Sequence, residues 1–276
     1  MKAARCMSGS RPDMIDTAVI LAGGLGTRLS EETGLKPKPL VDIGGQPILW
    51  HLMKLLHTQG IQHFIICLGY KGYLIKEYFQ NYMLHRSDVT MDFGAGTVRY
   101  HNRRTEDWTV SLIDTGKDTM TGGRLKRVRA YLPASPFLMT YGDGLADISL
   151  SALATHHAKS QCEATVTSVA PPGRFGALKT NDRGHVTGFL EKPTGDGGRI
   201  NGGFFILEKS VTNLIADDAT VFESTPLETL AANGNLSAFR HDGFWQPMDT
   251  LRDKTQLEGL WQSGRAPWKL WPDEVA

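Results

Sequence analysis

An apolar strand pattern followed at once by a glycine-rich turn constrains the fold of this chain more than any other feature. Residues 17–21 read Thr-Ala-Val-Ile-Leu, and three glycines follow within 22–26. A helical pattern then covers 46–59, and a second strand pattern covers 61–68. Strand, helix and strand within about 50 residues form a parallel crossover unit. The opening of the chain therefore predicts an α/β fold.

The rest of the chain continues this alternation, with β-rich interruptions over 88–114. The apolar run at 137–141 is typical of a buried parallel strand. We expect further helices over 72–84, 119–131, 149–160, 225–234 and 250–261, and further strands near 163–170, 176–180, 184–190 and 202–207. The expected architecture is a doubly wound, mostly parallel, Rossmann-like sheet flanked by helices, with small β-rich insertions. Residues 1–16 are expected to be a frayed leader, and 17–276 a single domain.

Composition excludes several classes of protein. The chain of 276 residues carries 30 basic and 29 acidic side chains, which argues against a nucleic-acid binder. Its three cysteines, at positions 6, 67 and 162, form no C-x-x-C pair, so we expect neither a disulfide scaffold nor a zinc site. This cysteine usage fits a reducing cytoplasm. No apolar run is long enough for a membrane-spanning helix.

Three phosphate-binding motifs compete for the glycine-rich turn. A Walker A loop needs Lys-Ser or Lys-Thr after a glycine, and this chain has neither there. A dinucleotide fingerprint needs a third glycine where Leu29 stands and an acidic residue after the second strand, where Gly69 stands. The remaining motif is G-G-x-G-T-R-L with K-P-x-x downstream, and it matches 23–29 and 36–39.

These segments, and a series that follows them, resemble the sugar-1-phosphate nucleotidylyltransferases, in particular the cytidylyltransferase branch of that family. The other matching segments are 68–72, 114–116, 121–127, 141–144, 171–176, 191–193, 201–204 and 244–250. The resemblance extends over roughly 17–271. One such segment is moderately specific, whereas the ordered series is highly specific.

The resemblance implies transfer of a cytidylyl group from CTP to α-D-glucose 1-phosphate, which gives CDP-glucose and pyrophosphate, with Mg²⁺ as cofactor. The attacking phosphate monoester needs no activating base, because its second pKa is near ~6 and it is mostly dianionic at neutral pH. The obstacle is repulsion between two polyanions, so the chemistry requires positioning and positive charge. The lack of any Ser-His-Asp or Cys-His arrangement agrees with this.

The resemblance also assigns the residues of the site. Arg28, Lys38 and Asp143 are expected to be catalytic, with Lys38 on the phosphates and Arg28 on the leaving pyrophosphate. The expected nucleotide-binding residues are Leu21, Ala22, Gly23, Gly24, Gly26, Thr27, Arg28, Lys38, Thr119, Thr121, Arg124, Gly142 and Asp143. The expected sugar-phosphate site consists of Tyr141, Gly176, Glu191, Lys192 and Asn201. Asp143 and Asp249 are expected to share the metal ion.

The residues taken alone leave structural alternatives open. Lys36 competes with Lys38 for the phosphate role. Asp143 lies between two glycines and also fits a turn aspartate. Asp249 or Thr250 also fits the N-cap of the final helix.

Similar alternatives apply elsewhere in the chain. The pair at 191–192 also fits a surface ion pair at a strand end, and 124–129 also fits a solvated basic helix face. The histidines lack metal-ligand spacing, and the late tryptophans fit core or subunit contacts.

Two broader questions stay open at this stage. The nucleotide is CTP by resemblance, with UTP or dTTP as alternatives. A nicotinamide or flavin oxidoreductase and a catalytically silent nucleotide-sugar sensor are the competing function classes. The resemblance further implies a homo-oligomer that supplies dideoxysugars for a surface polysaccharide such as the lipopolysaccharide O-antigen. The composition, rather than the resemblance, favours the cytoplasm and argues against a nucleic-acid or membrane partner.

Overall fold

The apolar run near the N-terminus forms β1 (Thr17–Ala22), an inner strand of a seven-stranded sheet of order β14-β10-β13-β8-β1-β4-β7. The computed structural model describes residues 15–24, 26, 34–171, 177–180, 183, 185–190 and 198–272. The other strands of the sheet are β4 (His63–Leu68), β7 (Thr109–Asp114), β8 (Phe137–Tyr141), β10 (Ala164–Val169), β13 (Ile200–Leu207) and β14 (Leu236–His241).

Most neighbouring strands of this sheet run parallel. β1 is parallel to both β4 and β8, β4 to β7, and β10 to β14. Only β13 runs antiparallel to its two neighbours, β10 and β8, among the described strands. The expected mostly parallel sheet is therefore confirmed.

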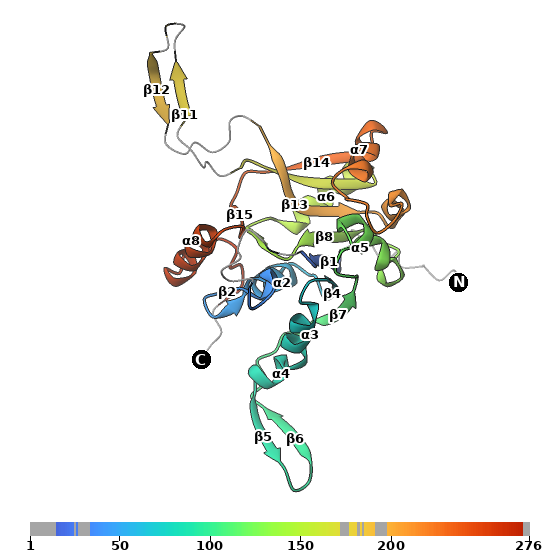
Figure 1. Cartoon of the computed structure of the whole chain (residues 1–276), viewed down its shortest axis with the longest axis vertical. Helices are drawn as coiled ribbons and strands as arrows, with labels where there is room; N and C mark the ends of the chain where they lie inside the picture. The colour runs from blue at the N-terminus through green and yellow to red at the C-terminus, as the bar shows by residue number, and fades with distance from the viewer. Residues whose placement is uncertain are drawn as a thin grey trace, which may run out of the picture.

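Helices cover both faces of the sheet (Figure 1). The α-helices are α2 (Ile48–Thr58), α3 (Gly72–Gln80), α4 (Tyr82–His85), α5 (Thr121–Arg127), α6 (Leu150–Ser160), α7 (Thr225–Ala232) and α8 (Leu251–Gln262). Short 3-10 helices are η2 (Lys38–Leu40), η3 (Arg129–Tyr131) and η4 (Lys209–Leu214).

The side chains of β1 alternate between the two faces of the sheet, which explains why helices cover both faces. Ile20 belongs to the core cluster that contains Leu52 of α2. Val19 belongs to the cluster on the other face, together with Leu125 of α5 and Leu230 of α7. Because successive side chains of a strand point to opposite faces, a strand that is apolar throughout requires cover on both sides. The helical layers provide that cover.

Small β elements account for the predicted insertions. One hairpin, β5 (Asp88–Asp92) with β6 (Thr97–His101), extends from the lower end in Figure 1. A second hairpin, β11 (Ala177–Thr180) with β12 (Val186–Leu190), extends from the upper end. The remaining short strands are β2 (Asp42–Ile43), β3 (Gln46–Pro47), β9 (Gly144–Ala146) and β15 (Trp245–Pro247).

The structure corrects several local expectations. The helices predicted over 72–84 and 119–131 are each divided into two pieces, and β2, β3, β9, β14 and β15 were not predicted. The segment 225–228 reads Thr-Pro-Leu-Glu, which predicts a capping box with Thr225 as the N-cap, and this prediction was wrong. Glu228 N–H donates to the carbonyl of Ser224, which makes Ser224 the N-cap, and its side chain accepts no capping bond.

The late tryptophans and one histidine form part of the core. Trp268 and Trp271 are buried beside His51, which is 0% exposed. The His51 Nε2–H donates to the carbonyl of Ile43 over 2.7 Å, and the Trp268 indole N–H reaches His51 Nδ1 over 3.4 Å. Burial lowers the pKa of His51 to about 4. Across the described segments, no helix is long and apolar enough to cross a bilayer.

Candidate active site

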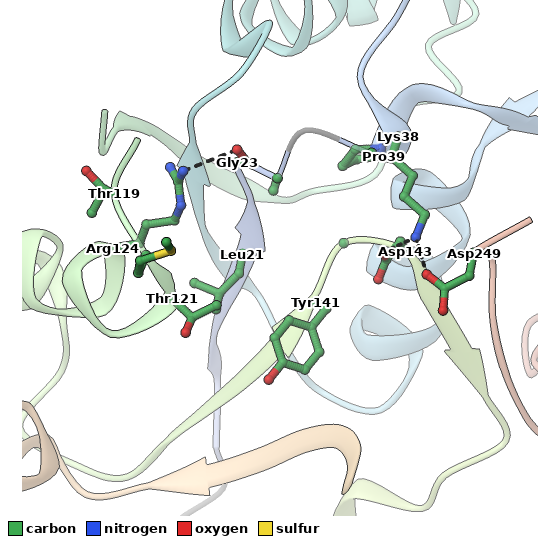
Figure 2. A pocket seen from close by; sticks show the side chains of 15 residues that line it. Leu21, Gly23, Lys38, Pro39, Thr119, Thr121, Arg124, Tyr141, Asp143 and Asp249 are labelled. Atoms are coloured by element: carbon green, nitrogen blue, oxygen red, sulfur yellow. Dashed lines mark hydrogen bonds and ion pairs between the residues drawn. The ribbon is translucent and has the colours of Figure 1, made fainter. Parts of the chain in front are cut away.

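A pocket of about 350 Å³ lies at the carboxyl ends of β1 and β8. From β1 the chain passes to β4 and β7 on one side, and then crosses to β8 on the other. Ligands of open α/β sheets bind at such a reversal of strand order. Figure 2 shows the lining residues, which are Leu21, Ala22, Gly23, Gly24, Gly26, Lys38, Pro39, Thr119, Met120, Thr121, Arg124, Tyr141, Gly142, Asp143 and Asp249.

Every predicted nucleotide-binding residue that the structure describes lines this pocket. Thr27 and Arg28 lie outside the described residues. Gly176, Glu191 and Lys192 of the predicted sugar-phosphate site lie outside them as well. Asn201 is on β13 rather than in the pocket wall, where its side-chain oxygen accepts from Gly203 N–H over 2.8 Å.

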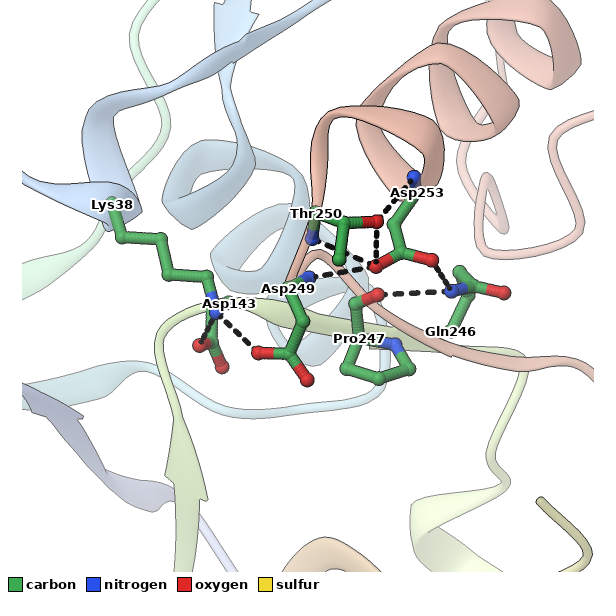
Figure 3. Close-up of polar contacts among 7 residues, drawn as sticks. All are labelled: Lys38, Asp143, Gln246, Pro247, Asp249, Thr250 and Asp253. Atoms are coloured by element: carbon green, nitrogen blue, oxygen red, sulfur yellow. Dashed lines mark hydrogen bonds and ion pairs between the residues drawn. The ribbon is translucent and has the colours of Figure 1, made fainter. Parts of the chain in front are cut away.

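Lys38 connects the two predicted metal ligands (Figure 3). Its ammonium group donates to a carboxylate oxygen of Asp143 and to one of Asp249, each over 2.7 Å. The lysine side chain is only 10% exposed. Burial alone would lower the pKa of Lys38, but the two carboxylates outweigh it and raise that pKa above its ordinary value. Lys36, the competing lysine, bonds instead to Asp42.

An antiparallel pair of short strands brings the two aspartates together. β9 follows Asp143 directly and pairs with β15, which ends two residues before Asp249. Met248 N–H also donates to the carbonyl of Asp143 over 2.9 Å. Backbone hydrogen bonds on both sides therefore fix the two carboxylates next to each other.

The start of α8 settles the alternative interpretation of Asp249. Thr250 is the N-cap, and it forms a capping box with Asp253. Asp253 Oδ2 accepts from the backbone N–H groups of Thr250, over 2.8 Å, and Asp249, over 3.1 Å. Thr250 and Asp253 cap the helix, so the Asp249 side chain is not needed as the cap. Its carboxylate instead accepts from Lys38, as Figure 3 shows.

Arg124 forms the opposite wall of the pocket (Figure 2). Its buried guanidinium donates over 2.8–3.2 Å to acceptors on three separate segments of the chain, namely Gly23 O, Leu68 O, Thr115 Oγ1, Gly116 O and Lys117 O. A Cβ added to Gly23 would lie 2.2 Å from the guanidinium carbon, so glycine is required for this contact. A direct contact between Arg124 and the nucleotide stays a prediction.

Glu223 is a residue of this region that the sequence analysis missed. The Tyr141 hydroxyl donates to Glu223 Oε1, and Thr121 Oγ1 donates to Oε2 over 2.5 Å. Burial and the Glu223 charge raise the pKa of Tyr141 above its ordinary value, so the phenol stays neutral. No motif surrounds Glu223 in the sequence, and only the fold brings it beside two predicted site residues.

The basic face predicted near α5 is tied to a neighbouring segment. Lys126 donates to the carbonyls of Ile215 and Ala216, and Arg127 bonds to Asp218. Neither of the two cations lines the pocket.

Sequence comparisons identify similar proteins. Residues 17–247 match the family described as "Nucleotidyl transferase". A protein of Salmonella typhimurium named glucose-1-phosphate cytidylyltransferase is 60% identical over 92% of this chain and 99% of its own length. A Bacillus subtilis protein named probable glucose-1-phosphate cytidylyltransferase is 44% identical, with the same coverage.

Solved structures give the same fold. HddC from Yersinia pseudotuberculosis superposes with a TM-score of 0.66 at 27% identity, and covers 90% of this chain and 100% of its own. A second structure of HddC is complexed with GMP-PN at the same similarity. A UDP-glucose pyrophosphorylase complexed with UDP-glucose has a TM-score of 0.65 at 16% identity, with coverage of 91% of this chain and 100% of its own, a likeness that bears on the fold alone.

Proposed function

Because this chain belongs to the nucleotidyl transferase family, we propose that it transfers the cytidylyl group of CTP to α-D-glucose 1-phosphate. A phosphate oxygen of the sugar forms a bond to the α-phosphorus, the bond from that phosphorus to the β-phosphate oxygen breaks, and pyrophosphate leaves. The observation that carries the proposal is the convergence of Lys38, Asp143 and Asp249 in a pocket at the strand-order reversal. The 60% identity to a relative named for this activity supports the choice of substrates.

Asp143 and Asp249 would hold Mg²⁺. The donor set fits, because Mg²⁺ takes one or two carboxylates and completes its shell with waters and substrate phosphates. Both carboxylates already lie within 2.7 Å of one cationic atom, and the described residues contain no larger cluster of acidic, histidine or cysteine side chains. The ion, when bound, supplies charge neutralisation between the two phosphate groups.

The chain's own residues supply positioning and further positive charge. The glycine-rich segment lets backbone approach the triphosphate closely, and Lys38 contacts the phosphates. Arg28 stabilises the leaving pyrophosphate. On the sugar side, Tyr141 and Asn201 act together with Gly176, Glu191 and Lys192. The family resemblance supports these assignments, and the pocket lining supports those of the glycines, Lys38 and Tyr141.

The same proposal includes the cellular setting. The enzyme is a cytoplasmic homo-oligomer, and its product enters the synthesis of a surface polysaccharide. Free thiols at Cys67 and Cys162 support a reducing compartment.

The test is pyrophosphate release from CTP, UTP, dTTP and ATP, each combined with several sugar 1-phosphates. The proposal predicts the highest kcat/KM for CTP with glucose 1-phosphate and no turnover without a divalent cation. Preference for UTP or dTTP would replace the nucleotide assignment. If CTP stabilised the protein but no pyrophosphate were released, the protein would be a nucleotide-binding sensor instead of an enzyme.

A further inference from the structure

The Lys38 ammonium bridges the two carboxylates that a shared metal ion would require. It lies 2.7 Å from one oxygen of Asp143 and 2.7 Å from one oxygen of Asp249. A magnesium ion bound to the same two oxygens, at about 2.1 Å from each, would lie close to this ammonium. Three positive charges in so small a space repel strongly. The ammonium and the ion therefore exclude each other.

We propose that Lys38 holds the two aspartates in place of the metal until a triphosphate arrives, so that the site takes up metal and nucleotide together. This inference rests on the proposed function, because it assumes that Asp143 and Asp249 are the metal ligands. It goes further by giving Lys38 two successive partners, first the carboxylates and then the phosphates.

The backbone at Lys38 favours a movement of the side chain alone. Pro37 and Pro39 flank the lysine, and its carbonyl accepts from Val41 N–H over 3.1 Å within η2. The four-carbon side chain retains its rotatable bonds. Gly23, Gly24 and Gly26 line the same pocket, so a triphosphate bound there offers the displaced ammonium a new anionic partner.

The charge balance explains why metal alone should bind weakly. Removing the ammonium from both carboxylates without another anion leaves a largely buried positive charge unpaired, which is costly. A triphosphate removes this cost, since it pairs with the ammonium while the metal pairs with the aspartates. Metal and nucleotide then promote each other's binding.

Titration with Mn²⁺ in the absence of nucleotide tests this inference. The readout is unbound Mn²⁺, followed by electron paramagnetic resonance, and needs no catalysis. Lys38→Met removes the competing charge and keeps most of the side-chain volume. It should bind Mn²⁺ more tightly than the unsubstituted protein by on the order of tenfold. The double variant Lys38→Met with Asp143→Asn should lose that gain.

Lys36→Met is the matched control, because Lys36 is a nearby lysine that bonds to Asp42 outside the pocket. It should bind Mn²⁺ like the unsubstituted protein. Equal affinity for Mn²⁺ in Lys38→Met and the unsubstituted protein, or an equal gain in Lys36→Met, would overturn the inference. If Lys38→Met does not fold, Lys38→Gln should show the gain and Lys38→Arg should not.

The proposed activity and the proposed exchange of partners by Lys38 can be rejected independently of each other. Cytidine-dependent pyrophosphate release with no gain of Mn²⁺ affinity in Lys38→Met would reject the exchange of partners and leave the activity. The expected gain without any pyrophosphate release would support Lys38 as the occupant of the metal position and reject the activity.

Discussion

Asp143 and Asp249 each accept a hydrogen bond of 2.7 Å from the same ammonium group, although one follows β8 and the other precedes α8. The pairing of β9 with β15 brings them together. Two carboxylates and a lysine in a pocket of about 350 Å³ form an arrangement that can control the charge of two reacting phosphates.

Gly23 is expected to tolerate no side chain. In Gly23→Ala the new Cβ would lie 2.2 Å from the Arg124 guanidinium, which is held by acceptors on three segments of the chain. Forcing such a group to shift costs about 1–3 kcal/mol. Thermal unfolding should show a lower Tm for Gly23→Ala. Gly24→Ala is the matched control, since its Cβ would meet nothing within 4 Å. Equal Tm values for the two variants would contradict the role given to Arg124.

Glu223 is expected to hold Tyr141 and Thr121 in place. In Glu223→Ala two hydroxyl donors lose their acceptor, at a cost of about 1–3 kcal/mol in the free energy of unfolding. Combining it with Tyr141→Phe should cost less than the sum of the two single changes, because both remove one contact. Urea unfolding measures the three variants. Glu228→Ala, at an exposed position of α7, is the control. Strict additivity would mean that the Glu223–Tyr141 contact contributes nothing.

Stability is expected to fall in mild acid through His51. Its pKa is about 4 in the folded chain, against about 6.5 when unfolded, so folding favours the neutral ring. The stabilisation is complete above pH 6.5 and is lost as the pH falls from 6.5 toward 4. Between pH 7 and 5 this group should remove about 2 kcal/mol from the free energy of unfolding.

Urea unfolding at pH 7 and pH 5 measures this loss. His51→Gln should lack that part of the pH dependence, whereas His63→Gln, at an exposed position, should retain it. An unchanged pH dependence in His51→Gln would show that another group is responsible.

The strands and helices with strong periodicity could be predicted from the sequence, and the short elements could not. β1 and β8 are mostly apolar and were expected within one residue of their observed bounds. β9 and β15 are three residues long and exist because they pair with each other across the fold. A pairing of this kind leaves no local pattern.

In the site, too, the features marked by a motif could be predicted from the sequence, and the others could not. The glycine-rich motif indicated a phosphate pocket, and the resemblance to a family indicated that Asp143 and Asp249 belong to it. Their separation in the chain prevented any derivation of the contact from spacing. Glu223 was missed because a single glutamate without a motif has no distinguishing feature until Tyr141 and Thr121 are seen beside it.

The most direct test of the account compares Asp143→Ala, Asp249→Ala and the double variant, by pyrophosphate release from CTP at saturating glucose 1-phosphate and Mg²⁺. Each single change should reduce the rate by on the order of 10²–10³. Asp42→Ala, which removes an aspartate bonded to Lys36 outside the pocket, should retain the rate. If both aspartates act on one ion, the double variant should lose little more than either single variant. A loss equal to the product of the two single losses would contradict the shared site.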